Sequence, residues 1–211
     1  MSGFAATEVT IKTAEKSLMI GLSFSVAPGE VLTIMGSSGS GKSSLLSYVV
    51  GSLSSEIQAS GKLYLNDRRI DHLQISDRKV GILFQDDLLF PHLSIGENIL
   101  FAMREPKDKK TRIQIINEHL KEAGLEDFFN RKPSTLSGGQ RARVGALRTL
   151  LSKPQLILLD EPFSKLDKSL RSNFRNYVFS EIKKQNIPCI LVTHDEVDVP
   201  PNSHKIVLEA I

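Results

Sequence analysis

The chain has 211 residues, of which 40% are hydrophobic and 24% charged, and this composition is typical of a globular protein with a buried core. Its net charge of +3 is too small to indicate a nucleic-acid partner, and its single cysteine, Cys189, excludes an internal disulfide and fits a reducing compartment. The first residues lack the apolar core of a signal peptide, and no stretch approaches the ~20 apolar residues of a membrane-spanning helix, so we expect a soluble, intracellular protein.

The first half of the chain predicts strands around one helix. The first thirty residues alternate apolar and polar side chains, as in EVTIK and LMIGLSFSV, which is typical of half-buried antiparallel strands. The run VLTIM at residues 31–35 is apolar throughout and predicts a strand buried on both faces. A glycine-rich loop and a predicted helix from about Lys42 to Val50 follow. Further strands are predicted for GKLYLN and for VGILF at residues 80–84.

The second half changes to helical periodicity between about residues 91 and 136. Ile113, Ile116 and Leu120 share one predicted helix face, and Gly124 lies where a helix end favours a left-handed residue. The apolar runs QLILLD (155–160) and CILVTH (189–194) predict central parallel strands, and Cys189 is expected to be a small buried hydrophobe there. Between these strands we expect a helix that ends near Asn186 and carries a core-facing stripe: Leu166, Leu170, Phe174, Val178 and Ile182.

These elements predict a single α/β domain over residues 1–211. Its sheet would be mostly parallel, with an N-terminal antiparallel β subdomain and an α-helical subdomain inserted at about residues 91–136. No internal repeat, low-complexity tract or linker interrupts it.

The loop GSSGSGKS at residues 36–43 matches the phosphate-loop pattern G-x-x-x-x-G-K-[ST] and lies between a predicted strand and a predicted helix. Its glycines allow backbone N–H groups to surround phosphates. We expect the ammonium of Lys42 to reach the β and γ phosphates and the hydroxyl of Ser43 to bind Mg²⁺. The loop alone indicates an NTPase or a kinase. The expected nucleotide-binding residues are Gly36, Ser37, Ser38, Gly39, Ser40, Gly41, Lys42, Ser43 and Ser44.

Two adjacent carboxylates favour a hydrolase. Asp160 ends an apolar strand, where its carboxylate can contact the hydration shell of Mg²⁺. Glu161 follows directly and points elsewhere, so it can take a proton from an attacking water. One carboxylate for metal and one for water is the arrangement of a hydrolase.

A second predicted anion site lies at TLSGGQRARV, residues 135–144. Ser137 and Gln140 form an S-x-x-Q capping box, so the N–H groups at Ser137, Gly138 and Gly139 are expected to face an anion. The loop at residues 36–43 already encloses its own phosphates. The second site is therefore predicted to bind a phosphate held by a partner.

With LSGGQ at residues 136–140, the chain resembles the ATP-binding cassette (ABC) ATPases over essentially its whole length, which implies a P-loop NTPase (RecA-like) core. The resemblance implies that Gln85 is the Q-loop glutamine, that Asp167 in SKLD belongs to the D-loop, and that His194 is the switch histidine contacting the γ-phosphate. It also implies that ATP and Mg²⁺ are the cofactors, with Glu161, His194 and Gln85 catalytic. The implied metal ligands are Ser43, Gln85 and Asp160, and the signature that binds the ATP of a second copy in a head-to-tail dimer comprises Leu136, Ser137, Gly138, Gly139 and Gln140.

The stretch RIDHLQISDRKVGILFQDDLLFPHLSIGENILF is similar to bacterial importer subunits of the thiamine, iron, polyamine and sulfate kind. This resemblance implies a chain bound to transmembrane permease subunits on the cytoplasmic face of the inner membrane, with a periplasmic or lipoprotein solute-binding protein as a further partner. The alternatives are the cassette of an exporter or of a lipoprotein-extraction machine, and a soluble ABC ATPase acting on DNA or ribosomes. A P-loop small-molecule kinase would leave LSGGQ and His194 without a role. No nucleic-acid partner is expected.

The sequence departs from the family pattern in two places. Family members usually carry an aromatic residue that stacks on adenine, and an ungapped alignment places Thr13 at that position; Phe4 is the alternative ring. The chain also ends soon after His194, so we expect no C-terminal regulatory domain of the kind found on some sugar-importer and related ATPases.

Overall fold

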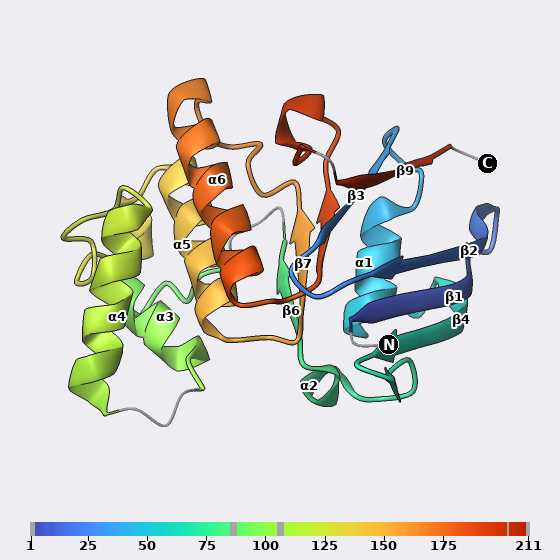
Figure 1. Cartoon of the computed structure of the whole chain (residues 1–211), viewed down its shortest axis with the longest axis horizontal. Helices are drawn as coiled ribbons and strands as arrows, with labels where there is room; N and C mark the ends of the chain where they lie inside the picture. Colours follow the sequence, from blue (N-terminus) through green and yellow to red (C-terminus); the bar gives the residue numbers. More distant parts are fainter. Residues whose placement is uncertain (1–2, 85–87, 105–107, 202, 210–211) are drawn as a thin grey trace. The chain divides into compact units, whose positions relative to one another are not determined.

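The computed structural model describes residues 3–84, 88–104, 108–201 and 203–209 (Figure 1). The chain divides into two compact units, each assembled from segments that lie apart in the sequence. The helical segment expected at about residues 91–136 lies within the second unit. The first unit contains Met1–Ile82, Gln155–Glu161 and Ile182–Ile211, and the second contains Leu83–Pro154 and Pro162–Glu181.

The first unit contains the antiparallel sheet that the alternating N-terminal pattern predicts. Its strand order is β2-β1-β4-β5, and β1 pairs antiparallel with both β2 and β4. Apolar residues on one face of this sheet are fully buried, among them Val9, Ile11 and Leu63. The four strands are β1 (Phe4–Lys12), β2 (Ser17–Val26), β4 (Gln58–Leu65) and β5 (Arg68–Arg69).

A second, five-stranded sheet has the order β6-β7-β8-β3-β9. β3 is parallel to β8 and β9, and β7 is parallel to β8, as the continuous apolar runs predict. The register aligns Ile34, Val192 and Asp160 in one row, so the loops that follow β3, β8 and β7 begin at the same edge of the sheet. The strands are β6 (Val80–Leu83), β7 (Leu156–Asp160), β8 (Cys189–Val192), β3 (Val31–Gly36) and β9 (His204–Leu208).

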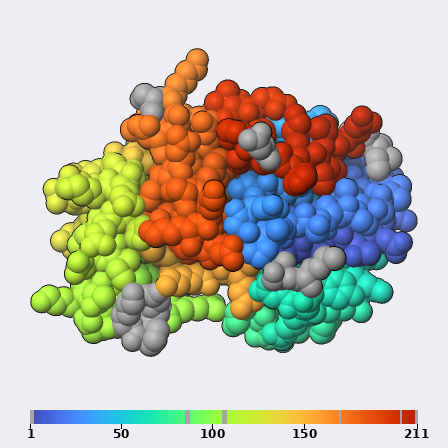
Figure 2. Space-filling view, viewed as in Figure 1, coloured from blue at the N-terminus to red at the C-terminus, as the bar shows by residue number. Residues whose placement is uncertain are grey.

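Helix α1 (Lys42–Val50) begins and ends at the predicted residues and contributes Leu45, Leu46 and Val49 to a core shared with both sheets. Because β9 pairs with β3, segments from both ends of the chain, blue and red in Figure 2, lie next to each other on the visible face of this unit. This unit also contains the short helix α2 (Ile75–Arg78) and the 3₁₀ helix η2 (Glu196–Asp198).

The second unit is helical, and the helix end at Gly124 has the predicted cap. Gly124 has a φ of 67°, and the N–H groups of Leu125 and Gly124 donate to the carbonyls of Leu120 and Lys121 at 2.8 and 2.9 Å, which confirms the predicted left-handed helix end. The helices are α3 (Ile95–Ala102), α4 (Lys109–Glu122), η1 (Pro133–Thr135), α5 (Gly138–Leu151) and α6 (Lys168–Lys184), of which the last turn of α6 falls in the first unit.

The predicted stripe of five apolar residues on one helix is partly wrong. Leu166 is buried but precedes α6, and Leu170 is 39% exposed, whereas Phe174, Val178 and Ile182 are buried. A helix advances about 100° per residue, so each step of four residues drifts about 40° around the axis, and five residues separated by four such steps cannot share one narrow face. Strand β9 was not predicted, because its edge position leaves a half-exposed sequence without a clear pattern.

Cys189 is buried, and burial raises the pKa of its thiol, as expected for a small core residue rather than a reactive one. Among the residues that the structure describes, no helix combines the length and the apolar character needed to cross a membrane.

The guanidinium of Arg78 is buried and joins the end of α1 to the segment that precedes β6. It donates to the carbonyls of Tyr48 and Val49 at 2.7 and 3.0 Å. It also donates to the carbonyls of Leu73 and Asp71 at 2.9 and 2.6 Å. Burial lowers the pKa of Arg78, and the four carbonyls, two of them at the negative end of the α1 dipole, compensate that cost.

We expect Arg78→Met to lower the free energy of unfolding by about 3 kcal/mol, because four buried or partly buried carbonyl groups would lose their donor. Arg68→Met is the control: Arg68 is exposed, and surface substitutions change stability by only about 0.5 kcal/mol. Urea unfolding measures both. Equal unfolding midpoints for the two variants would contradict the account of Arg78.

Candidate functional site

The loop at residues 36–43 follows β3 and is shaped by its glycines. Gly36 has a φ of 152°, and a Cβ there would lie 2.4 Å from the carbonyl oxygen of Leu208 in β9. Gly41 has a φ of 88°, and a Cβ there would lie 3.1 Å from the Cβ of Leu18. The left-handed backbone and the close neighbours exclude larger residues at both positions.

Lys42 and the start of α1 face the same loop. The Nζ of Lys42 donates to the carbonyls of Gly36 and Ser37 at 2.8 and 2.7 Å and to the hydroxyl of Ser40 at 3.4 Å. Gly41 occupies the N-cap position of α1, so no side chain caps the helix there, and its first turn contains no acidic residue. The N–H groups of that turn and the ammonium of Lys42 form a positive site suited to an anion.

Ser43 and Asp160 lie 117 positions apart in the sequence and are brought together by α1 and β7. The hydroxyl of Ser43 donates to Oδ2 of Asp160 at 3.1 Å. Burial raises the pKa of Asp160 above its ordinary value, the charge of Glu161 adds to this, and the Ser43 hydrogen bond and Lys42 oppose it. These two side-chain oxygens beside the phosphate loop are of the type that Mg²⁺ prefers and could contribute to holding one.

Glu161 and His194 follow the adjacent strands β7 and β8. The backbone N–H of Glu161 donates to the carbonyl of Val192 at 2.9 Å, and Glu161 has a left-handed φ of 47°. Its Oε1 lies 2.9 Å from Nδ1 of His194, whose side chain is 64% exposed. A left-handed backbone is uncommon for a residue other than glycine, and here it coincides with a carboxylate aimed at an exposed imidazole.

The second unit contains LSGGQ at the start of α5, with the predicted capping box. The hydroxyl of Ser137 accepts the N–H of Gln140 at 3.3 Å, and Oε1 of Gln140 accepts the N–H of Ser137 at 2.9 Å. The expectation that the N–H of Ser137 is free for an anion is therefore wrong. The N–H groups of Gly138 and Gly139 are the first-turn donors left, and Leu136 is buried.

The structure brings LSGGQ together with the SKLD segment, residues 164–167. A Cβ at Gly139 would lie 2.9 Å from the carbonyl oxygen of Lys165 and 3.2 Å from the side chain of Leu166, whereas a Cβ at Gly138 would meet no described atom closer than Nη2 of Arg141 at 3.9 Å. Oδ1 of Asp167 accepts the N–H of Leu170 at 3.0 Å near the start of α6. Gly139 therefore allows two segments of this unit to approach closely, whereas Gly138 leaves room for a ligand.

Sequence reasoning missed Arg143, which is buried beneath the signature. Its Nη1 donates to the carbonyls of Ala123 and Gly124 at 2.6 and 3.3 Å, and burial lowers its pKa while the charge of Asp167 raises it. The signal was present, because this arginine falls among small and apolar residues in RARVGALRTL.

Gln85, Phe4 and Thr13 were expected at the nucleotide site or at the position of its adenine-stacking ring. Gln85 lies outside the described residues. Phe4 is 2% exposed and packs against Phe24 with ring centroids 5.9 Å apart, so the expectation that it could stack on a base is wrong. The Thr13 hydroxyl accepts the N–H of Lys16 at 3.1 Å and so stabilises the turn between β1 and β2.

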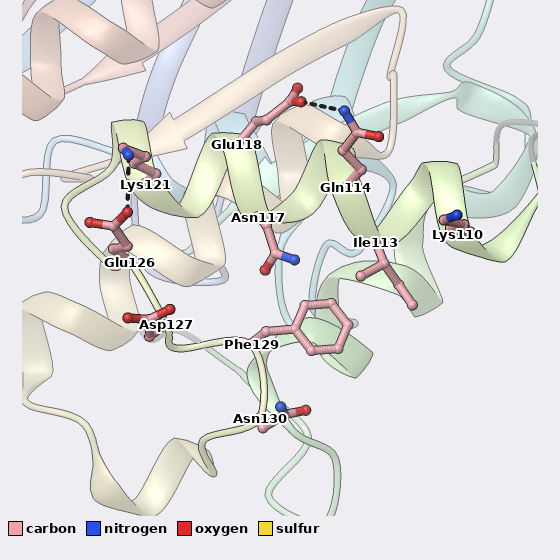
Figure 3. A pocket seen from close by; sticks show the side chains of 10 residues that line it. All are labelled: Lys110, Ile113, Gln114, Asn117, Glu118, Lys121, Glu126, Asp127, Phe129 and Asn130. Carbon is pink, nitrogen blue, oxygen red and sulfur yellow. Dashed lines mark hydrogen bonds and ion pairs between the residues drawn. The ribbon is translucent and has the colours of Figure 1, made fainter.

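A groove of about 910 Å³ lies in the second unit between α4 and residues 126–130 (Figure 3). Several of its polar groups are paired with one another: Lys121 with Glu126 at 3.0 Å and Gln114 with Glu118 at 3.0 Å. None of the residues expected to act on nucleotide lines it. The groove is therefore not part of the candidate site.

The raised pKa of Asp160 leads to a prediction about the stability of the protein without ligand. The folded protein keeps a proton on Asp160 over a pH range in which the unfolded chain has lost it, so Asp160 costs stability above its raised pKa and costs none below its ordinary pKa. We expect Asp160→Asn to melt at a higher temperature than wild type at pH 7 without Mg²⁺ or nucleotide. This difference should shrink as the pH falls through the raised pKa.

Thermal melts at several pH values measure this effect, and Glu56→Gln, at an exposed carboxylate, is the control that should show no such gain. An Asp160→Asn protein less stable than wild type at pH 7 would contradict the assigned burial cost.

Known proteins are similar to this chain in sequence and in fold. The family model described as ABC transporter matches residues 19–164. The ABC transporter ATP-binding protein YnjD of Escherichia coli is 47% identical over 195 residues, which cover 92% of this chain and 90% of YnjD. The Fe(3+) ions import ATP-binding protein FbpC of Fusobacterium nucleatum is 34% identical over 207 residues, which cover 95% of this chain but only 55% of FbpC.

Solved structures agree with the sequence comparisons. The dimeric cassette MJ0796 in a post-hydrolysis state with ADP and Pi superposes with a TM-score of 0.83 at 28% identity, covering 98% of this chain and 96% of that one. A second dimeric structure of MJ0796 gives 0.84, also at 28% identity, with coverage of 98% and 94%. The predicted α/β P-loop NTPase fold is thus confirmed, and the chain belongs to the ABC transporter family as an ATP-binding, ATP-hydrolysing cassette.

Proposed function

We propose that this chain is the ATPase subunit of a membrane importer and that the site at the edge of the five-stranded sheet hydrolyses ATP. The observation that carries the proposal is the convergence of four side chains beside the phosphate loop. Ser43 and Asp160 lie 3.1 Å apart, and Glu161 and His194 lie 2.9 Å apart.

In this proposal the phosphates of ATP lie on the backbone N–H groups of residues 36–44, and Lys42 exchanges its loop carbonyls for the β and γ phosphates. Ser43, Asp160 and Gln85 would hold Mg²⁺, which supplies charge neutralisation on the phosphate oxygens when bound. Within the described residues no group of three His, Cys, Asp or Glu side chains could hold a metal. Few protein ligands are sufficient for a metal ion whose other ligands are oxygens of the substrate phosphates.

Proton transfer is assigned to Glu161, which takes a proton from the attacking water. His194 shares a hydrogen bond with that carboxylate, and its exposed imidazole can contact the γ-phosphate as well. The carboxylate of Glu161 lies 2.9 Å from Nδ1 of His194, whereas Asp160 accepts a hydrogen bond from Ser43, so we assign Glu161 to the water and Asp160 to the metal.

The signature is proposed to act on the ATP of a second copy. The first-turn donors at Gly138 and Gly139, and the absence of any described atom within 3.9 Å of a Cβ at Gly138, suit a phosphate that approaches from outside this chain. The two similar MJ0796 structures are dimers, which supports a second copy as the partner. We therefore propose a head-to-tail dimer in which each signature closes on the partner's nucleotide.

The membrane partner is proposed to be a permease, docked at an exposed apolar cluster of the second unit. Leu88, Phe90 and Phe101 are 61%, 36% and 72% exposed, and the two phenylalanine rings lie 5.2 Å apart edge to face. Exposed aromatic side chains grouped in this way are typical of protein-binding surfaces. The name of FbpC, an iron-import protein, favours import, with a solute-binding protein outside the membrane and this chain on its cytoplasmic face.

Glu161→Gln keeps the shape of the side chain but removes the proton acceptor, so we expect ATP hydrolysis to fall by about 10²–10⁴ while ATP binding persists. The variant should accumulate as an ATP-bound dimer, because the dimer normally opens after hydrolysis. Adding Ser137→Arg should abolish the dimer, since it removes the cap of α5 and places a long side chain at the open face of the signature.

Light scattering with Mg-ATP, together with nucleotide binding, measures these outcomes. Ser134→Arg is the matched control: it is exposed in η1, three residues before Ser137, and should leave the Glu161→Gln dimer intact. A Glu161→Gln, Ser137→Arg protein that still dimerises with ATP would contradict the trans arrangement.

A further inference from the structure

The imidazole of His194 is exposed, but the residues that flank it are anchored in the protein interior. Thr193 and Asp198 are each 1% exposed. The hydroxyl of Thr193 donates to Oδ2 of Asp198 at 3.2 Å and accepts the backbone N–H of Asp195 at 3.1 Å. A single buried hydroxyl therefore joins the residues on both sides of His194.

This turn is also fixed at both of its ends. Before His194, the backbone N–H of Thr193 donates to the carbonyl of Ile34 in β3 at 3.3 Å. After it, Oδ1 of Asp195 accepts the N–H of Val197 at 3.0 Å and so caps the 3₁₀ helix η2, which contains Asp198. The histidine thus leaves the sheet on a short loop whose backbone has little freedom.

A buried carboxylate is a costly way to build such a loop. Desolvation of Asp198 has to be offset by hydrogen bonds, whereas an apolar residue of similar size would avoid that cost. Hydrogen bonds have a direction, however, and apolar packing does not. The Thr193–Asp198 pair therefore specifies one backbone arrangement at His194, which apolar packing alone would specify less sharply.

We infer that Thr193 and Asp198 are positioning residues that act through His194. They hold its backbone so that Nδ1 lies within 2.9 Å of Glu161, the geometry that the proposed hydrolysis needs. The inference rests on the proposed function for its effect on turnover. Its structural part, that the pair sets the environment of the His194 imidazole, can be tested separately.

The first test is NMR on the full-length protein. The imidazole signals of His194 are assigned by their absence in His194→Ala. Thr193→Val, which keeps the shape of the side chain but removes the hydroxyl, should shift these signals, and Thr193→Ser should restore them. Thr33→Val is the matched control, because Thr33 is a fully buried threonine of the adjacent strand β3 whose hydroxyl has no hydrogen-bond partner.

Unchanged His194 signals in a folded Thr193→Val protein would overturn the inference, and so would an equal shift in Thr33→Val. If Thr193→Val does not fold, Thr193→Ala removes the same hydroxyl without placing a methyl group against the carboxylate of Asp198. Its signals decide between the same two outcomes.

The second test is steady-state hydrolysis of Mg-ATP. Thr193→Val should lower kcat about 10- to 100-fold, as small misplacements of catalytic groups do, with KM for ATP within about twofold of wild type. In the His194→Ala background the same change should cost no more than about twofold further, because a residue that acts through His194 has nothing left to position.

The outcomes separate the two claims. Full activity of His194→Ala would contradict the proposed role of His194, while the NMR signals would still decide the positioning role of Thr193. A large further loss of kcat in the double variant would show that Thr193 acts by another route and would overturn the inference.

Discussion

The constraint on which the site depends is the burial of β3, β7 and β8 on both faces. Strands covered on both faces are almost entirely apolar, with Thr33 of β3 as a buried exception, so their charged and catalytic side chains lie where the strands end. Parallel alignment then places those ends at one edge of the sheet. The row Ile34, Val192 and Asp160 puts the phosphate loop, His194 and Glu161 next to one another although they come from three distant parts of the sequence.

Helix α1 completes this site because the hydrogen bonding at its two ends differs. At its C-terminal end, the buried guanidinium of Arg78 donates hydrogen bonds to the carbonyls of Tyr48 and Val49. At its N-terminal end, Gly41 provides no side-chain cap, which leaves first-turn N–H groups for an anion. The contrast with α5 is informative, because there Ser137 and Gln140 cap the helix and leave only the two glycines.

In the protein without ligand, the carboxylates at the edge of the five-stranded sheet lower the stability of the fold. Burial and the neighbouring Glu161 both raise the pKa of Asp160, and Glu161 itself adopts a left-handed backbone. A cation bound by the oxygens of Ser43 and Asp160 would offset the cost of burying the Asp160 charge. The site is therefore built for its ligands rather than for stability alone.

Much of this arrangement could be predicted from the sequence. Most strands, the limits of α1 and the Gly124 helix end followed from local patterns with a clear physical cause, and Ser43 and Asp160 were both expected at one Mg²⁺ site. Strand β9 could not be predicted, since an edge strand is only partly buried and has a weak pattern. The roles of Arg143, Thr193 and Asp198 depend on hydrogen bonds that pattern reading did not single out.

The central claim is that the loop around Lys42 binds and hydrolyses ATP, and phosphate release by the purified chain with Mg-ATP tests it most directly. Wild type should release phosphate, and ATP at 100 times its dissociation constant should add about 2.7 kcal/mol of stability. Lys42→Ala should lose phosphate release and most of that stabilisation, while Lys16→Ala, at an exposed lysine of the β1–β2 turn, should keep both. An unchanged ATP-induced stabilisation in Lys42→Ala would contradict the account.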